Sequence, residues 1–303
     1  MQAEISQLNR HTRRLTDRDG FWAFIMLLPN VVGFFVFTLF PVVVSFLLSF
    51  TSYDILTPPS FVGLANYQEL FLFDKIVGQV VKNTLIYTAV VVPVGMFISL
   101  MLAIALDKKI KFLRVFRAAF FMPVITSAVA VSLVWQWLYN PDFGLLNSLL
   151  RTMGISNPPA WLNSQVYALP AVMVVAIWKN LGYNMLLFLA GLQNISVTYY
   201  EAAALDGANG FQQFRHITWP LLSPTTFFVF VMTVISSFQV FDLVQLMTRG
   251  GPGRATSTLV HYIYQNAFKY FYMGYASALA YLLFAMVLIV TLLNMTLQRK
   301  VVY

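Results

Sequence analysis

Long apolar runs separated by short polar stretches dominate the pattern of this 303-residue chain. A helix needs about 20 consecutive apolar residues to cross a bilayer. Charge-free runs predict six such helices, of which the fourth is interrupted by a single charge, Lys179, near its middle. The pattern therefore predicts an all-α polytopic membrane protein, in which a segment 1–20 precedes one transmembrane domain, 21–303. The expected spans are about 21–50, 83–106, 118–138, 164–192, 222–243 and 274–297.

Composition agrees with this pattern. The chain is 59% hydrophobic and 10% charged, with a mean hydropathy of +0.73, whereas a soluble domain carries roughly 25% charged residues. The sequence contains no cysteine, its three histidines are scattered, and no Gly-Lys dipeptide forms a phosphate-binding loop. We therefore expect no metal site, and any ATP hydrolysis would belong to another subunit. The apolar run from Phe21 to Phe50 is too long for a signal peptide and reads as a retained first span.

The basic residues set an orientation. With the N-terminus inside, the cytoplasmic segments hold twelve lysines and arginines and the outer loops hold six. Because positive charge is enriched on the cytoplasmic side, both termini are expected inside. The net charge of +8 is thus explained by membrane orientation rather than by nucleic-acid binding. Two long outer loops, 51–82 and 139–163, are rich in turn residues and should form ordered external caps.

A polar, glycine-broken segment lies between the fourth and fifth spans, on the predicted cytoplasmic side. Thr198 and Glu201 have capping-box spacing, which predicts a short helix from about Tyr199 to Leu205 that ends at an Asp206-Gly207 turn. Asn209 should cap a second short helix over 210–218, with Gln212 at its third position. Pro220 and Pro224 then begin span five. From the residues alone, the segment is either a solvated connector or a small-residue face for another protein.

The stretch EAAALDGANGFQQFRHITWPLLSP closely resembles the EAA loop of ABC-importer permeases. FVGLANY, NPDFGLLN, LAGLQNI, TRGGPGRAT and YIYQNAF extend this resemblance along nearly the whole chain, to the first permease subunit of carbohydrate importers of the maltose and glycerol-phosphate types. It implies a type I ABC-importer permease fold with six spans and a coupling loop over 196–221. Ser196 departs from the family, which usually has proline there. The residues that the resemblance assigns to ATPase coupling are Glu201, Ala202, Ala203, Asp206, Gly207, Ala208 and Phe214.

The resemblance also implies partners and a mechanism. A second, homologous permease, two ATP-binding cassette ATPases and an extracytoplasmic solute-binding protein would complete the importer in a bacterial or archaeal cytoplasmic membrane. ATP and Mg would bind to the ATPases, with no cofactor in this chain. ATP binding would drive alternating access and the inward movement of a carbohydrate or related polyol. TRGGPGRAT and the two outer loops would receive the binding protein, and Glu201 would meet a basic residue of an ATPase.

Polar residues near the middle of spans four and five are candidates for a substrate cavity, because transport sites lie near the bilayer midplane. Packing between helices is the alternative, since small polar residues are common at such contacts. The candidate lining residues are Trp178, Asn180, Leu181, Gly182, Tyr183, Asn184, Thr233, Ser236, Ser237, Gln239 and Val240.

Lys179 is an intramembrane charge, which is costly unless it faces water or a partner. A structural pair with Asp242 or snorkelling is favoured, and contact with an anionic substrate stays open. The alternative function is a stand-alone secondary carrier or channel, although Lys179 is the one clearly intramembrane charge. No paired carboxylates or nucleophile–base arrangement supports an enzyme.

Overall fold

The computed structural model describes residues 20–107 and 111–298 and is almost entirely helical there. Five helices are long and apolar enough to cross a membrane, or six if one bent pair counts as a span. The predicted all-α membrane fold is thereby confirmed. The expected segment 1–20, apart from Gly20, lies outside the described residues together with its four arginines. Four further orienting basic residues also lie outside them: Lys108, Lys109, Arg299 and Lys300.

The first span runs over Gly20–Leu48 and includes the π-helical turn η1 (Phe35–Leu39) and α2 (Phe40–Leu48). The remaining elements are β1 (Thr51–Ser52), β2 (Ser60–Phe61), α3 (Ala65–Gln68), η2 (Glu69–Phe73), α4 (Lys75–Asp107), α5 (Leu113–Ile125), α6 (Ala128–Leu138), α7 (Leu145–Thr152), η3 (Trp161–Asn163), α8 (Ala168–Gln193), α9 (Val197–Leu205), α10 (Gly210–Gln213), η4 (Phe214–Thr218), α11 (Trp219–Leu221), α12 (Ser223–Phe238), α13 (Asp242–Met247), α14 (Leu259–Tyr264), η5 (Gln265–Lys269) and α15 (Met273–Gln298). The two short strands pair antiparallel, with Thr51 opposite Phe61.

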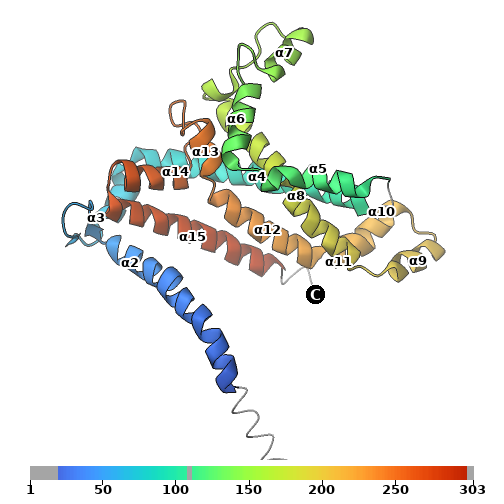
Figure 1. Cartoon of the computed structure of the whole chain (residues 1–303), viewed down its shortest axis with the longest axis horizontal. Helices are drawn as coiled ribbons and strands as arrows, with labels where there is room; N and C mark the ends of the chain where they lie inside the picture. The colour runs from blue at the N-terminus through green and yellow to red at the C-terminus, as the bar shows by residue number, and fades with distance from the viewer. Residues whose placement is uncertain (1–19, 108–110, 299–303) are drawn as a thin grey trace, which may run out of the picture.

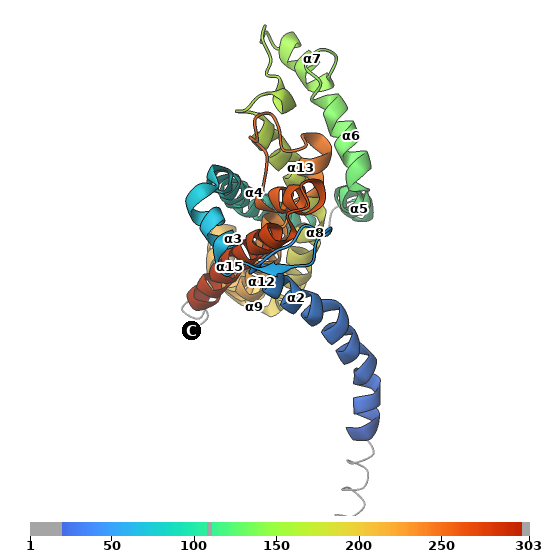
Figure 2. The same ribbon diagram turned by 90° about the vertical axis from the view of Figure 1, so that its left-hand side faces the viewer.

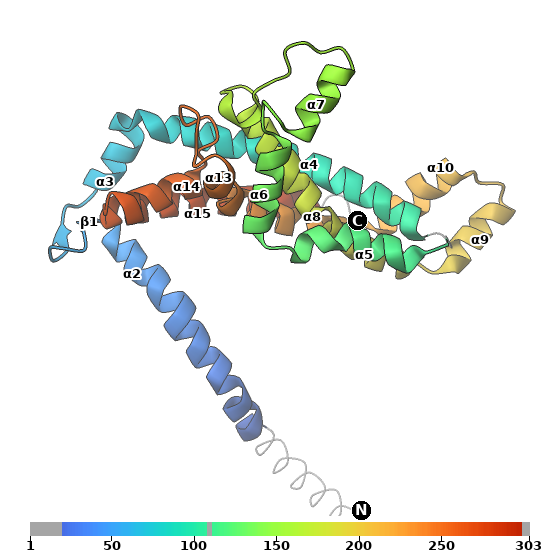
Figure 3. The same cartoon turned by 45° about the horizontal axis from the view of Figure 1, so that its top comes forward.

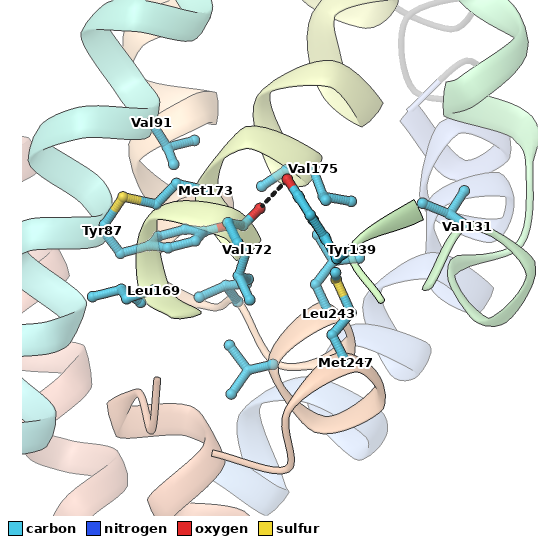
Figure 4. Packing of buried hydrophobic residues seen from close by; sticks show 14 residues of the cluster. Tyr87, Val91, Val131, Tyr139, Leu169, Val172, Met173, Val175, Leu243 and Met247 are labelled. Atoms are coloured by element: carbon cyan, nitrogen blue, oxygen red, sulfur yellow. Dashed lines mark hydrogen bonds between the residues drawn. The ribbon is translucent and has the colours of Figure 1, made fainter. Parts of the chain in front are cut away.

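Four long helices, α4, α8, α12 and α15, run roughly alongside one another and form the body of the molecule (Figure 1). The contact between α4 and α8 is the most extensive. Its outer part is an apolar cluster in which Tyr87 and Val91 of α4 meet Val172 of α8. Figure 4 shows Tyr139, at the end of α6, reaching into this cluster, where its hydroxyl donates to the Ala171 carbonyl over 3.2 Å. Apolar packing therefore joins the outer halves of three spans.

The first span leaves this body at an angle (Figure 2). In its most apolar 18 consecutive residues, no residue is buried against the rest of the protein. Contacts lie near its outer end, where Tyr281 of α15 donates to the Val42 carbonyl over 2.6 Å and its ring packs on Phe46. Most of the helix thus offers its surface to lipid or to another protein.

The structure differs from the sequence prediction in spans two and three. α4 begins at Lys75, eight residues before the expected start at 83. It starts directly after Asp74, which accepts hydrogen bonds from Tyr262 and Tyr275 over 2.7 and 2.6 Å. The expected third helix, 118–138, is two helices, α5 and α6, whose axes bend by 99° at Thr126 and Ser127. Hydroxyl groups at the break replace the missing helical bonds: Thr126 Oγ1 donates to Met122, and Ser127 Oγ accepts from Val129.

The outer loop 139–163 forms an ordered cap, as the sequence predicts. Asn147 of α7 is fully buried. Its amide donates to the carbonyls of Pro141 and Pro159, each over 3.2 Å, while its oxygen accepts from Trp161 Nε1 over 2.7 Å. One side chain therefore holds both ends of the loop together.

Gly182 sets the distance between α5 and α8. A Cβ at this position would collide with the Phe120 carbonyl, whereas one at Gly78 in α4 would meet nothing within 4 Å. We predict that Gly182→Ala lowers the stability of the purified protein by about 1–3 kcal/mol, the usual cost of overpacking. Gly78→Ala is the matched control and should be neutral or stabilising, because alanine favours a helix. Thermal unfolding in detergent compares them, and equal melting temperatures would contradict the close packing.

Candidate functional site

A cavity of about 180 Å³ lies among α4, α8, α12 and the start of α13. It is bounded by residues near the middle of spans four and five, as the sequence suggested. Nine of the twelve singled-out positions in these spans line it: Lys179, Asn180, Leu181, Asn184, Thr233, Ser236, Ser237, Gln239 and Val240. The fold therefore brings together amide and hydroxyl groups that lie some 50 residues apart in the chain.

Three predicted lining residues lie elsewhere. Trp178 packs its ring edge-on against Trp135 of α6, with 5.6 Å between centroids. Gly182 is buried against the backbone of α5. Tyr183 is exposed and does not border the cavity. For Trp178 and Gly182 the packing alternative describes the structure better, because successive helical residues point in different directions.

Sequence reasoning missed the contribution of α4. Tyr87, Val91 and Gly95 line the cavity at four-residue intervals, which places them on one face of this helix. These residues lie in an apolar stretch that gives little sign of a cavity. The one available signal was the small residue Gly95, two helical turns after Tyr87 on the same face of α4. Asp242 also lines the cavity, at the first position of α13.

The polar groups of the cavity are held in place by their own helices. Thr233 Oγ1 donates to the Val229 carbonyl over 2.7 Å and lies 3.5 Å from Asn184 Oδ1 across the α8–α12 contact. Ser236 donates to the Thr233 carbonyl, and Asn180 Nδ2 to the Ala176 carbonyl, each over 3.0 Å. Hydroxyl and amide oxygens remain able to accept further hydrogen bonds. Such an arrangement suits a polar solute with many hydroxyl groups.

Lys179 does not form the expected pair with Asp242. Its ammonium donates to the carbonyls of Thr126 and Pro123, over 3.0 and 3.4 Å, at the C-terminal end of α5. Asp242 Oδ1 instead accepts from the Leu243 amide over 2.8 Å. The charge is therefore held by a structural contact, with the bend in the third span rather than with Asp242.

The 196–221 segment projects from one end of the helical body (Figure 3). Its first helix, α9, begins at Val197, and Ser196 is its N-cap, accepting from the Thr198 amide over 3.4 Å. The predicted cap at Thr198 is therefore wrong, since this residue already lies within the helix. The predicted turn is confirmed, with Gly207 at φ +79°. Asn209 and Gln212 form the expected capping box at α10.

The seven residues assigned to coupling lie along this projecting segment. Glu201, Ala202, Asp206 and Gly207 are exposed, and Ala203, Ala208 and Phe214 are partly buried. The sequence prediction missed the large apolar side chains beside them: Leu205 is 91% exposed and Phe211 is 70% exposed. Tyr200 ties α9 to the following turn, because its hydroxyl lies 2.9 Å from Thr218 Oγ1. The segment thus presents acidic and apolar groups on a fixed support.

At the opposite end, the 248–256 loop is fastened to the start of α4. Asn83 Nδ2 donates to the carbonyls of Arg254 and Ser257, over 3.0 and 2.9 Å. His261 lies beneath the loop between Ser257 Oγ and Gln245 Oε1, at 3.0 and 3.1 Å. Burial, with nearby Arg254 and Lys269, lowers the pKa of His261, so the ring is neutral at pH 7 and binds both neighbours as a neutral group.

Comparisons with known proteins agree on one family. The family described as "Binding-protein-dependent transport system inner membrane component" matches residues 21–303. The probable ABC transporter permease protein YesP of Bacillus subtilis is 38% identical over 91% of this chain and 90% of its own length. The arabinooligosaccharides transport system permease protein AraP of the same organism is 35% identical, covering 93% and 91%. A crystal structure of a bacterial ABC transporter involved in the import of the acidic polysaccharide alginate aligns with a TM-score of 0.83 at 22% identity, covering 96% of this chain and 100% of the other. This last likeness concerns the fold.

The cap of α9 gives a direct test of the segment. Replacing Ser196 by alanine removes the side-chain acceptor for the Thr198 amide and should destabilise α9 by about 1 kcal/mol. Hydrogen exchange across Val197–Leu205 should accelerate about fivefold if these amides exchange by local opening. Thr198→Ala is the comparison: it removes a hydroxyl that lies 2.8 Å from Ser196 Oγ but leaves the capping oxygen in place, so it should change exchange less than Ser196→Ala. The reverse ranking would restore Thr198 as the cap.

Proposed function

Because the chain belongs to the family of binding-protein-dependent transport system inner membrane components, we propose that it supplies half of the translocation path of an ATP-driven importer for a carbohydrate or related polyol. The observation that supports this proposal is that one exposed segment joins the two helices that line the cavity. The two helices that contribute most of the polar lining of the cavity, α8 and α12, are joined to each other by the exposed 196–221 segment. A partner that moves this segment moves both cavity walls.

The partner at the 196–221 segment is an ABC-type ATPase subunit. Its cleft would receive α9, with Leu205 and Phe211 as apolar anchors and Glu201 as the charge that meets a basic side chain. Exposed apolar side chains next to small residues are suited to a protein contact, since the small residues allow close approach. ATP and Mg bind to that subunit, and closing it pushes the segment toward the membrane. The seven assigned residues, Glu201, Ala202, Ala203, Asp206, Gly207, Ala208 and Phe214, form the contact.

A second, homologous permease completes the path. The first span supports this, because it diverges from its own chain and leaves its apolar surface without an internal partner. Two permeases, each with one projecting segment, require two ATPase subunits. The cavity then lies between two chains and is exposed alternately to the two sides of the membrane. ATP binding opens it outward and hydrolysis returns it inward.

The solute-binding protein docks on the outer face. The 248–256 loop and the caps over 51–82 and 139–163 are the docking surface, and the rigid Asn83 and Asn147 networks support it. Arg249 and Arg254 of this loop both adopt positive φ. The binding protein delivers the solute, so the cavity itself requires only modest affinity.

The solute is a carbohydrate or related polyol. The cavity supplies amides and hydroxyls, which pair well with sugar hydroxyls, and a relative carries the name arabinooligosaccharides transport system permease protein. The residues proposed to line the path are those that the cavity and the sequence prediction share: Asn180, Leu181, Asn184, Thr233, Ser236, Ser237, Gln239 and Val240. Membership of the family favours this function over a stand-alone secondary carrier or channel.

Uptake into proteoliposomes separates these functions. The complete importer, with arabinotriose, maltotriose and sn-glycerol 3-phosphate as probes, should accumulate only the solute that raises the melting temperature of its binding protein. Uptake should require internal ATP and the binding protein, and ionophores should leave it unchanged. Accumulation without ATP that follows an ion gradient would support a secondary carrier instead.

Two substitutions test the projecting segment. Glu201→Lys reverses the proposed charge contact, and Gly207→Trp places a bulky side chain at a residue with φ +79°. Each should lower ATP-driven uptake by more than about tenfold, which corresponds to a loss of about 1.4 kcal/mol, while the chain stays in the membrane.

Asp107→Lys, an exposed charge reversal at the C-terminal end of α4, is the matched control, because it lies outside both the 196–221 segment and the proposed docking surface. Membrane fractions should contain equal amounts of all three variants. Normal uptake by both segment variants would exclude the proposed contact.

A further inference from the structure

Lys179 has a structural environment that its position in the sequence does not explain. It lies near the middle of α8 and is partly buried, and its ammonium lies at the break between α5 and α6. A charge in the middle of a span is expensive, so its retention calls for a specific interaction. The contacts with Thr126 and Pro123 provide it, because a helix C-terminus carries partial negative charge and carbonyls without helical partners.

The other bonds at the break are local. Thr126 Oγ1 donates to the Met122 carbonyl over 2.9 Å, and Ser127 Oγ accepts from the Val129 amide over 3.3 Å. These hydroxyls close the two helix ends but connect the break to no other element. Lys179 connects it to α8, and the close approach at Gly182 presses α5 against the same helix.

The far side of the break is connected to the cavity. Gln136 of α6 donates to the carbonyls of Leu246 and Met247, over 2.8 and 3.2 Å, at the end of α13. Two residues at the beginning of α13, Asp242 and Leu243, line the cavity. A continuous set of contacts therefore runs from α8, through Lys179, the break and Gln136, to a wall of the cavity.

We propose that Lys179 is a positioning residue for transport, which holds the break of the third span against α8 so that α6 and α13 follow when α8 moves. This inference rests on the proposed function in one respect: the motion of α8 comes from the 196–221 segment. In this arrangement Lys179 acts through the backbone of α5 rather than by touching the solute, although it borders the cavity.

The geometry of the break can be measured directly, because the chain contains no native cysteine. Spin labels at Val115→Cys on α5 and Trp137→Cys on α6, both exposed positions, report the bend in the reconstituted complex. A continuous helix would separate the two Cα atoms by about 33 Å, at 1.5 Å per residue, and the bend shortens this distance. Lys179→Met should lengthen or broaden the distance distribution, whereas Lys179→Arg, which retains charge and donors, should preserve it.

Transport kinetics distinguish positioning from contact with the solute. With whichever of the three probe solutes the importer accumulates, Lys179→Met should lower the maximal rate about tenfold without changing the half-saturating concentration. Lys179→Arg should remain within about threefold of the parent protein, because the guanidinium also donates to carbonyls. Lys179→Gln, with a shorter neutral donor, should fall between them and substitutes for Lys179→Met if that variant fails to assemble.

Three outcomes would overturn the inference. One is an unchanged distance distribution in Lys179→Met, or in Lys179→Gln if only that variant assembles. A second is full transport by the same variant, and a third is a changed half-saturating concentration or solute preference with the bend intact, which would place Lys179 on the solute. Glu201→Lys keeps the two proposals separate, since it should abolish uptake and leave the resting bend unaltered.

Discussion

Every backbone carbonyl that leaves a helix inside an apolar environment needs another donor, and this requirement governs where the chain can break its spans. At the first break Lys179 and Thr126 supply donors. At the second, between α12 and α13, Thr258 Oγ1 donates to the Val240 carbonyl over 3.0 Å. Hydrocarbon supplies no donors, so side chains from nearby and distant positions meet the carbonyls at each break.

The second break is also where the cavity forms, whereas the first is linked to the cavity through Lys179. Continuous helices would pack along their full lengths, as α4 and α8 do through Tyr87, Val91 and Val172. Because α12 ends at Phe238, the residues that follow it, Gln239, Val240 and Asp242, line the cavity. Polar lining and broken backbone therefore have a common origin. The fold pairs this central cavity with a projecting segment whose ends continue into the cavity-lining helices.

Two glycines are required for different physical reasons. Gly182 is required by packing, because the α5 backbone occupies the space of a side chain. Gly207 is required by conformation, since its φ is +79° and its surroundings are open. A larger residue at the first position changes the distance between helices, and at the second it changes the direction of the chain before α10. Neither residue lines the cavity.

The sequence by itself determined the membrane class, the approximate spans and the helix–turn–helix character of the 196–221 segment. These follow from local rules: the length of apolar runs, the capping pair Asn209 and Gln212, and a glycine at a left-handed turn. Local rules failed at Thr198, where the preceding Ser196 takes the cap, and in the third span, where an apolar run conceals a 99° bend. Only the tertiary structure decided that Tyr87 and Gly95 face the cavity while Trp178 does not, and that Lys179 binds carbonyls rather than Asp242. The physical reason is that an apolar pattern or an intramembrane charge indicates that a residue requires a packing or hydrogen-bonding partner. Which residue becomes that partner depends on which helices the fold places side by side.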